Sequence, residues 1–340
     1  MLAPFNVGDS LRVYRLQRKG VSLDLQKGLT QPRKPLLEAW LAFLTQQAMG
    51  RPTQVLYDPP DGEAFMQVSY RAHQAAADVV YVAPALEEGR GTPDAWSRLL
   101  DGACVEAATR GIQRVFANLP ESGAEVDVFH QAGFSLYGSE DVYVLTGLTP
   151  DQREGDQIGL RPQNPEDWPA IQRLCVAVTP QRVRQAEGGI AVAIDRGGSY
   201  QRYVLPAEVG NDLLAALTLN VGTLAHWLRV IAHPNAQSAT IDSLVRSGLA
   251  ILDPHPPRTV YCNVRRYEGG VRGALESAGF ELFDTRALLV KHTVAWIKAS
   301  AQDLVPALKG SAELVPPAYH VNSEPELRPS NGRLAAEHEA

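Results

Sequence analysis

The sequence predicts an α/β protein in which a domain with a mixed, mostly antiparallel sheet and flanking helices occurs twice. The first observation is an apolar stripe at Trp96, Leu99, Leu100, Ala103, Cys104 and Ala107. Apolar residues at these intervals line one face of a helix. The second observation is that the stripe returns 145 residues later (241 − 96 = 145), at Ile241, Leu244, Val245, Gly248, Leu249 and Leu252.

The elements that follow each helix also match. A short helix in each copy closes with Ala-Gly-Phe, and its glycines, Gly133 and Gly279, lie 146 residues apart (279 − 133 = 146). Glycine just past a helix C-terminus favours the left-handed turn that ends a helix. Matching strands precede and follow this helix, over 114–118 and 134–144 in one copy and 258–263 and 280–290 in the other. A repeat of this length indicates a duplicated domain, not a solenoid unit.

Each copy begins with helices and strands of its own. In the first copy the spacing predicts a helix over 34–47, after a segment at 11–16 that could open a strand. Three strands should follow, over 54–57, 64–70 and 78–83. In the second copy we expect a strand at 158–162, a helix at 166–174, and strands at 201–205, 215–220 and 223–231.

Composition also predicts where the domains end. The polar stretch 146–158 contains Gly and Pro and is typical of an inter-domain connection. We therefore expect a first domain over 1–147, a linker over 148–157, a second domain over 158–298, and a tail over 299–340. The tail is rich in proline and acidic at its end, which favours partial disorder. The two domains should pack as one rigid body through their sheets or final strands.

Charge and cysteine content exclude several classes of protein. The formal net charge is −6 and no Lys/Arg cluster stands out, which argues against nucleic acid as a partner. The three cysteines show no CxxC spacing, so neither a disulfide framework nor a metal site is expected. No apolar run is long enough to span a membrane, and no membrane partner is expected. These features predict a cytoplasmic protein.

The order helix, strand, short helix, Gly-Phe and long strand resembles the C-terminal half of the GNAT fold, that of the GCN5-related N-acetyltransferases. Two copies make the chain similar to a tandem GNAT protein. The resemblance implies an acyl-CoA-dependent N-acyltransferase with acetyl-CoA as co-substrate. It also implies a small-molecule or peptide amine as the acceptor, whose identity the sequence does not specify. The oligomeric state is not readable either.

The resemblance also indicates where acetyl-CoA should bind. In GNAT proteins a loop before the repeated helix presents backbone amides to the pyrophosphate, and small residues allow a close approach. In the second copy Thr240 and Asp242 fill the two small positions, and an acid there would repel a phosphate. The first copy is therefore expected to be the active one, in either of two alignments of its loop. Its expected cofactor-binding residues are Val82, Gly89, Arg90, Gly91 and Thr92.

The catalytic residues remain unassigned. The tyrosine that resembles a general acid in GNAT proteins is replaced by Phe129 and Leu275, which cannot donate a proton. Residues that could substitute for it, or act as a base, are Tyr137, Tyr143, His130, Glu63 and Asp78. A degenerate GNAT pair that binds a ligand or serves as a scaffold is the alternative function. A third alternative, a Fem-type aminoacyl-tRNA-dependent transferase, disagrees with the negative net charge.

Overall fold

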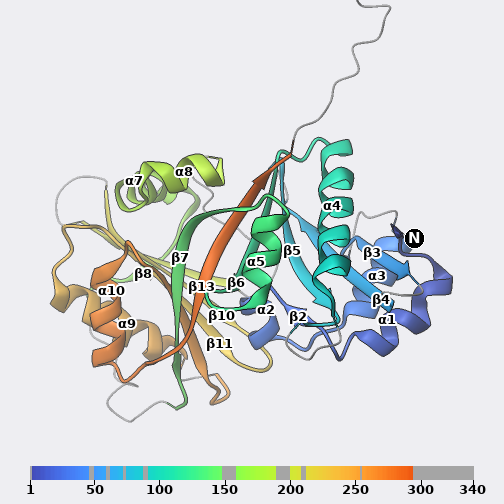
Figure 1. The fold of residues 1–340 in the computed structure, drawn as a ribbon. Coiled ribbons are helices and arrows are strands. Elements are labelled where there is room, and N and C mark those ends of the chain that lie inside the picture. Colours follow the sequence, from blue (N-terminus) through green and yellow to red (C-terminus); the bar gives the residue numbers. More distant parts are fainter. Residues whose placement is uncertain are drawn as a thin grey trace, which may run out of the picture. The chain divides into compact units, whose positions relative to one another are not determined.

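The computed structural model describes residues 2–45, 50–58, 62–71, 74–86, 91–147, 158–188, 200–207, 212–252 and 255–293. These residues belong to one compact unit, in which helices flank a long mixed sheet (Figure 1). No helix in this part of the chain is both long and apolar enough to cross a membrane. The predicted domain limits stay a prediction, because the linker 148–157 and the tail 299–340 lie outside the described residues.

The first half contains the predicted strands and the predicted long helices. Its strands are β1 (Leu2–Pro4), β2 (Val21–Ser22), β3 (Thr53–Asp58), β4 (Gly62–Tyr70), β5 (Ala76–Ala83), β6 (Arg114–Pro120) and β7 (Ser135–Leu145). Its helices are η1 (Val7–Asp9), α1 (Ser10–Leu16), α2 (Leu25–Thr30), α3 (Pro35–Leu44), α4 (Pro93–Thr109) and α5 (Ala124–Gln131). The strand expected at 11–16 is wrong, because this segment is α1. Val13 and Leu16, three residues apart, both point into a core shared with Ala39 of α3.

Among the described residues, the second half repeats this order without an equivalent of β2 and with one helix fewer. Its strands are β8 (Arg161–Pro162), β9 (Tyr200–Pro206), β10 (Leu213–Val221), β11 (His226–Ala232), β12 (Val260–Arg265) and β13 (Glu281–His292). Its helices are η2 (Pro165–Asp167), α7 (Trp168–Val178), α8 (Gln181–Glu187), α9 (Ser238–Leu252) and α10 (Gly269–Ser277). The φ angles of Gly133 and Gly279 are +84° and +80°, so both glycines take the left-handed conformation that their position predicts.

The two halves exchange their final strands. The sheet order is β1-β3-β4-β5-β6-β13-β7-β12-β11-β10-β9-β8, with β2 paired to β5 beside it. Strand β13 of the second half therefore lies between β6 and β7, and β7 of the first half lies against β12 (Figure 1). The expectation that the halves pack through their final strands is confirmed by this pairing. Neither half has a complete sheet of its own.

The exchange has an internal two-fold relation. In the pairing of β7 with β13, Glu140 lies directly opposite Arg286. These residues are 146 positions apart (286 − 140 = 146), which is the spacing that relates Gly133 to Gly279. Glu140 and Arg286 are therefore equivalent positions of the two copies. The local two-fold axis passes between them.

Candidate functional site

Each half contains one place where two parallel strands separate. Strands β5 and β6 pair only from Ala76 to Asp78, and β11 and β12 pair only from His226 to Leu228. Beyond these residues the strands diverge, and we name the two places the first fork and the second fork. Backbone N–H and C=O groups along a diverging edge need other partners. An extended ligand that carries amide groups can supply them.

In the first fork the free edge of β5 is occupied by the protein itself. Val21 of β2 pairs with Val82, and the Leu23 N–H donates to the Val80 carbonyl at 2.9 Å. The same segment continues beyond the strand, where the Ala85 N–H donates to the Lys19 carbonyl at 2.8 Å. The backbone groups that an extended ligand would pair with are thus already bonded to β2.

Apolar side chains fill the space beside this edge. Leu23, Trp96, Leu119 and Phe129 belong to one buried cluster, and none of them is more than 2% exposed. The Trp96 indole donates to the Pro84 carbonyl at 2.9 Å, and its ring lies 6.3 Å from that of Phe129. These core side chains therefore occupy the space in the first fork where a ligand would lie.

The start of α4 offers few free amides to a phosphate. The Gly91 N–H donates to the Ala85 carbonyl at 3.1 Å, and the Thr92 hydroxyl caps the helix by accepting from the Ala95 N–H at 3.2 Å. Pro93 has no N–H, and Asp94 places an acid in the first turn. Of the predicted cofactor-binding residues, Val82, Gly91 and Thr92 are therefore engaged within the protein. The other two, Gly89 and Arg90, lie outside the described residues.

A glycine allows β2 to approach so closely. A Cβ built on Gly20 would lie 2.5 Å from the Val82 carbonyl oxygen and 2.6 Å from the Ala83 Cβ. We expect Gly20→Ala to destabilise the protein by about 1–3 kcal/mol, since backbone must shift to admit the methyl group. Urea unfolding measures this, with Gly273→Ala as the control. Gly273 lies in α10 with open space around it, so the control should be neutral or slightly stabilising. Equal effects of the two substitutions would contradict the close approach of β2.

The second fork has no equivalent of β2. The His226 N–H donates to the Thr259 carbonyl, on the β12 side of β11. Because backbone groups alternate between the two edges of a strand, those of Val230 and Ala232 point to the same side. No strand in the described part of the chain pairs with them there. Between α7 and α8 only Thr179 and Pro180 intervene, too few residues to form a strand that could fill the fork.

Smaller side chains also line the second fork. Ile241 takes the position of Trp96, and Leu275 takes that of Phe129. Helix α9 begins at Ser238 and has no acid in its first turn, so Asp242 lies four residues into the helix and not at its start. The repulsion of a phosphate by Asp242 stays a prediction.

An ion pair crosses the second fork. Arg229 of β11 donates to both carboxylate oxygens of Glu268, which precedes α10, at 2.5 and 2.6 Å. Arg229 also donates to the Asn263 carbonyl at 3.0 Å, and Glu268 accepts from the Arg265 N–H at 2.9 Å. Burial alone would lower the pKa of Arg229, but the Glu268 charge outweighs it and raises that pKa. Arg229 therefore keeps its charge at every physiological pH.

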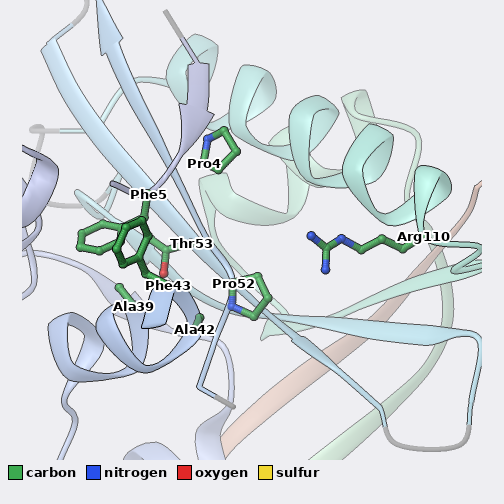
Figure 2. A pocket seen from close by; sticks show the side chains of 8 residues that line it. All are labelled: Pro4, Phe5, Ala39, Ala42, Phe43, Pro52, Thr53 and Arg110. Carbon is green, nitrogen blue, oxygen red and sulfur yellow. The ribbon is translucent and has the colours of Figure 1, made fainter. Parts of the chain in front are cut away.

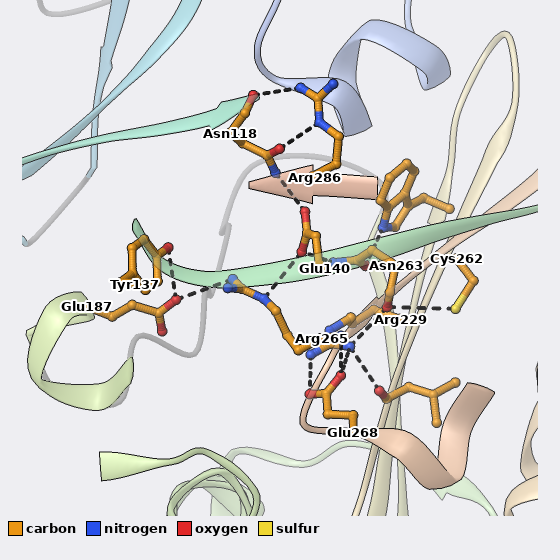
Figure 3. Close-up of polar contacts among 12 residues, drawn as sticks. Asn118, Tyr137, Glu140, Glu187, Arg229, Cys262, Asn263, Arg265, Glu268 and Arg286 are labelled. Atoms are coloured by element: carbon orange, nitrogen blue, oxygen red, sulfur yellow. Dashed lines mark hydrogen bonds and ion pairs between the residues drawn. The ribbon is translucent and has the colours of Figure 1, made fainter. Parts of the chain in front are cut away.

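A polar network connects this ion pair with the exchanged strands (Figure 3). Glu140, 5% exposed, accepts from Asn118 Nδ2 at 2.6 Å and from Asn263 Nδ2 at 3.1 Å, and it pairs with Arg265 at 3.3 Å. Asn118 and Asn263 are the asparagines that end the matching strands of the two copies. Burial would raise the pKa of Glu140, but the Arg265 charge and the two amides outweigh it and lower that pKa.

Four of the five residues considered as acids or bases contact other groups of the protein, whereas the buried Tyr143 hydroxyl has no hydrogen-bond partner. Glu63 pairs with Arg12 at 3.0 Å, and Asp78 pairs with Arg71 at 2.6 Å. Burial raises the pKa of Tyr137 and of Tyr143, so neither phenol gives up its proton readily. The His130 ring contacts the Phe134 carbonyl at 2.9 Å, at the end of α5. Glu63, Asp78, Tyr137 and His130 are therefore held by contacts within the protein, and the Arg229–Glu268 pair at the second fork was not predicted.

A separate hollow of about 330 Å³ lies on the first half. It is lined by Pro4, Phe5, Ala39, Ala42, Phe43, Pro52, Thr53 and Arg110 (Figure 2). None of these residues belongs to either fork. No group of His, Cys, Asp and Glu among the described residues is arranged to hold a metal ion.

Comparison with solved structures decides the fold. A GCN5-related N-acetyltransferase from Sphaerobacter thermophilus is similar with a TM-score of 0.55 and 13% identity, over 87% of this chain and 96% of its own. A tandem GNAT protein from the clavulanic acid biosynthesis pathway gives a TM-score of 0.50 and 12% identity, over 86% of this chain and 98% of its own. This chain has the tandem GNAT fold. No family model and no curated protein matches the GNAT-like chain by sequence.

Within the GNAT fold the two forks are equivalent positions. In the first GNAT-like half the fork is filled by β2 and by core side chains. In the second half the corresponding strand edge has no strand partner among the described residues. The resemblance inferred from the sequence is thus confirmed for the fold. The two copies differ in whether a strand of the protein pairs with the edge inside the fork.

Proposed function

We propose that the protein is an acyl-CoA-dependent N-acyltransferase whose second half binds the acyl-CoA. The observation that carries this proposal is that no described strand pairs with β11 at Val230 and Ala232, whereas β2 pairs with the corresponding edge of β5. At Val230 the backbone carbonyl instead accepts from the Arg229 side chain at 3.3 Å. The sequence favoured the first half because of Gly89 and Gly91. Because β2 pairs with the edge of β5 that a ligand would need in the first half, we assign acyl-CoA binding to the second half.

The second half offers groups for each part of such a ligand. The backbone groups of Ala232, and those of Val230 in exchange for the contact of its carbonyl with Arg229, can pair with the amides of an extended pantetheine arm. The backbone N–H groups of Ser238 and Ala239, at the start of α9, have no acceptor within the helix and can bind pyrophosphate. Acyl-CoA would supply a thioester as the acyl donor. The protein would hold it and the amine together, and backbone N–H groups would polarise the carbonyl, so rate enhancement comes mainly from positioning.

Two matched variants test which half binds. Ala239→Glu places an acid at the exposed start of α9, where it should repel a pyrophosphate while stabilising the helix itself. Gly89→Asp/Arg90→Glu adds two acids to the loop in which the sequence predicted a pyrophosphate site in the first half. Calorimetric titration with acetyl-CoA should show one site in the wild type, affinity lowered about tenfold or more in Ala239→Glu, and little change in the loop variant. The opposite pattern would restore the first half as the binding copy.

The second candidate function is a non-catalytic GNAT pair. The Arg229–Glu268 pair favours it, because a carboxylate held by two hydrogen bonds from an arginine is a poor general base. The same titration separates the two functions. If the wild type binds neither acetyl-CoA nor longer acyl-CoAs, the non-catalytic function is supported and the acyltransferase function is contradicted.

A further inference from the structure

Helices α1 and α3 lie side by side on one face of the first half. Val13 of α1 and Ala39 of α3 share a buried cluster with Tyr81 and Ala83 of β5. Val82, between these two strand residues, points instead into the core beneath α4. Both helices therefore cover the sheet face opposite α4, and their other sides are turned away from the sheet.

The outward sides of these helices carry large apolar residues. Leu11 and Tyr14 of α1 are 57% and 55% exposed, and Leu37 and Leu44 of α3 are 50% and 68% exposed. Spacings of three and seven residues place each pair on one side of its helix. Each helix thus has an apolar stripe that faces outward in addition to the one that is buried. Several large exposed apolar side chains on one face mark an interaction site.

Basic residues accompany the apolar ones. Arg15, Arg18 and Lys34 are exposed, and none of them forms an ion pair with another described residue. Residues 1–45 contain seven Lys and Arg and three Asp and Glu, a local charge of +4 (7 − 3 = 4), in a chain whose net charge is −6. Two of the three acids are neutralised locally, Asp9 by Arg12 and Asp24 by Arg51. We call the surface formed by Leu11, Tyr14, Leu37, Leu44, Arg15, Arg18 and Lys34 the α1–α3 face.

This combination selects among possible partners. A second copy docking through the same surface would bring Arg15, Arg18 and Lys34 against their own equivalents, which costs like-charge repulsion. An anionic lipid bilayer matches both properties, because its headgroups attract Lys and Arg while its acyl boundary accepts leucine and tyrosine. The long basic side chains can extend around the leucines toward the headgroups. We propose that the α1–α3 face binds the surface of an anionic membrane, without spanning it. This proposal departs from the expectation, based on the absence of a long apolar run, that a membrane is not a partner.

The full-length protein with lipid vesicles tests this proposal by co-sedimentation. Binding is expected to vesicles of phosphatidylcholine with phosphatidylserine, and not to phosphatidylcholine alone. Raising the salt from about 0.1 M to about 1 M should weaken it by screening. Arg15→Ala/Arg18→Ala should lower the partition coefficient about 25-fold, since each basic residue near the surface contributes about fivefold. Leu37→Ser/Leu44→Ser should lower it about tenfold or more through lost apolar contact.

The controls change equally exposed residues elsewhere. Val105→Ser/Leu282→Ser replaces two apolar side chains that are 65% and 54% exposed, and Arg182→Ala removes one exposed charge; both variants should bind like the wild type. Failure to bind anionic vesicles, or equal loss in variants and controls, would overturn the proposal. A concentration-dependent dimer that disappears in Leu37→Ser/Leu44→Ser would assign the face to a second copy instead.

Discussion

Replacing Glu140 by glutamine should lower the free energy of unfolding by about 3 kcal/mol or more, because it removes one partner of a buried charge network. The substitution keeps the shape of the side chain but leaves Arg265 without the Glu140 charge. It also turns an amide N–H₂ toward Asn118 or Asn263, both of which donate to Glu140 in the wild type. One of these two amides then loses its acceptor, and an unsatisfied buried donor costs free energy of its own. Urea unfolding measures the difference.

A matched control separates burial from charge. Glu121 pairs with Arg266 at 2.6 Å, but both side chains are 40% or more exposed. Glu121→Gln should therefore change stability by less than about 1 kcal/mol. Similar losses in the two variants would mean that the Glu140 network contributes no more than a surface ion pair.

The effect of Glu140→Gln should also depend on pH. The folded protein lowers the pKa of Glu140. Its carboxylate therefore stabilises the fold above the unfolded pKa of about 4.3, and this contribution is lost as the pH falls below that value through the folded pKa. The difference in stability between wild type and Glu140→Gln should be full at neutral pH and should shrink in acid. A difference that stays constant down to pH values well below about 4 would contradict the lowered pKa.

The second prediction concerns the strand exchange. Calorimetry should show one unfolding transition for both halves, and Leu288→Pro should shift or abolish that whole transition. Leu288 lies in β13 between Asn118 of β6 and Gly138 of β7, so proline there disturbs pairing with the first half although it lies in the second. Loss of a ladder hydrogen bond and the ring's steric clash together cost about 3 kcal/mol or more.

Proline at an edge strand provides the control. Ala3 lies in β1, which pairs on one side only, with β3. Ala3→Pro should therefore cost much less than Leu288→Pro. Two separated transitions in the wild type, or a Leu288→Pro variant in which only one of two transitions moves, would show that the halves fold independently.

The repeated pattern was sufficient to predict the fold, because its signals are local. The stripe that begins at Trp96 and the one that begins at Ile241 each follow from helical spacing within a few turns. The glycines Gly133 and Gly279 report a backbone conformation at their own positions. Agreement of such local signals in two copies fixed the element order of the GNAT fold.

The closed first fork could not be predicted, because it depends on a contact between distant segments. Val21 and Ser22 form a strand of only two residues, and nothing in their sequence indicates pairing with Val82 some sixty positions later. The small residues Gly91 and Thr92 indicated a loop that could approach a phosphate, but they could not show that Leu23 belongs to the core cluster beside it. The Arg229–Glu268 pair is also long-range, which is why neither residue was assigned a role.

The position of Glu140 and Arg286 bears on how such a protein arises. In a symmetric dimer of one short chain, the residue on the two-fold axis faces its own copy, so a charge there would face the same charge. Opposite charges can occupy this position only when the two copies differ in sequence, as the two halves of this chain do. Each half of this protein is thus adapted to the other and no longer to itself: two first halves would place carboxylate against carboxylate, and two second halves guanidinium against guanidinium. Such a division of charge also ties each copy to the other, so that the remaining positions of the two copies can diverge separately.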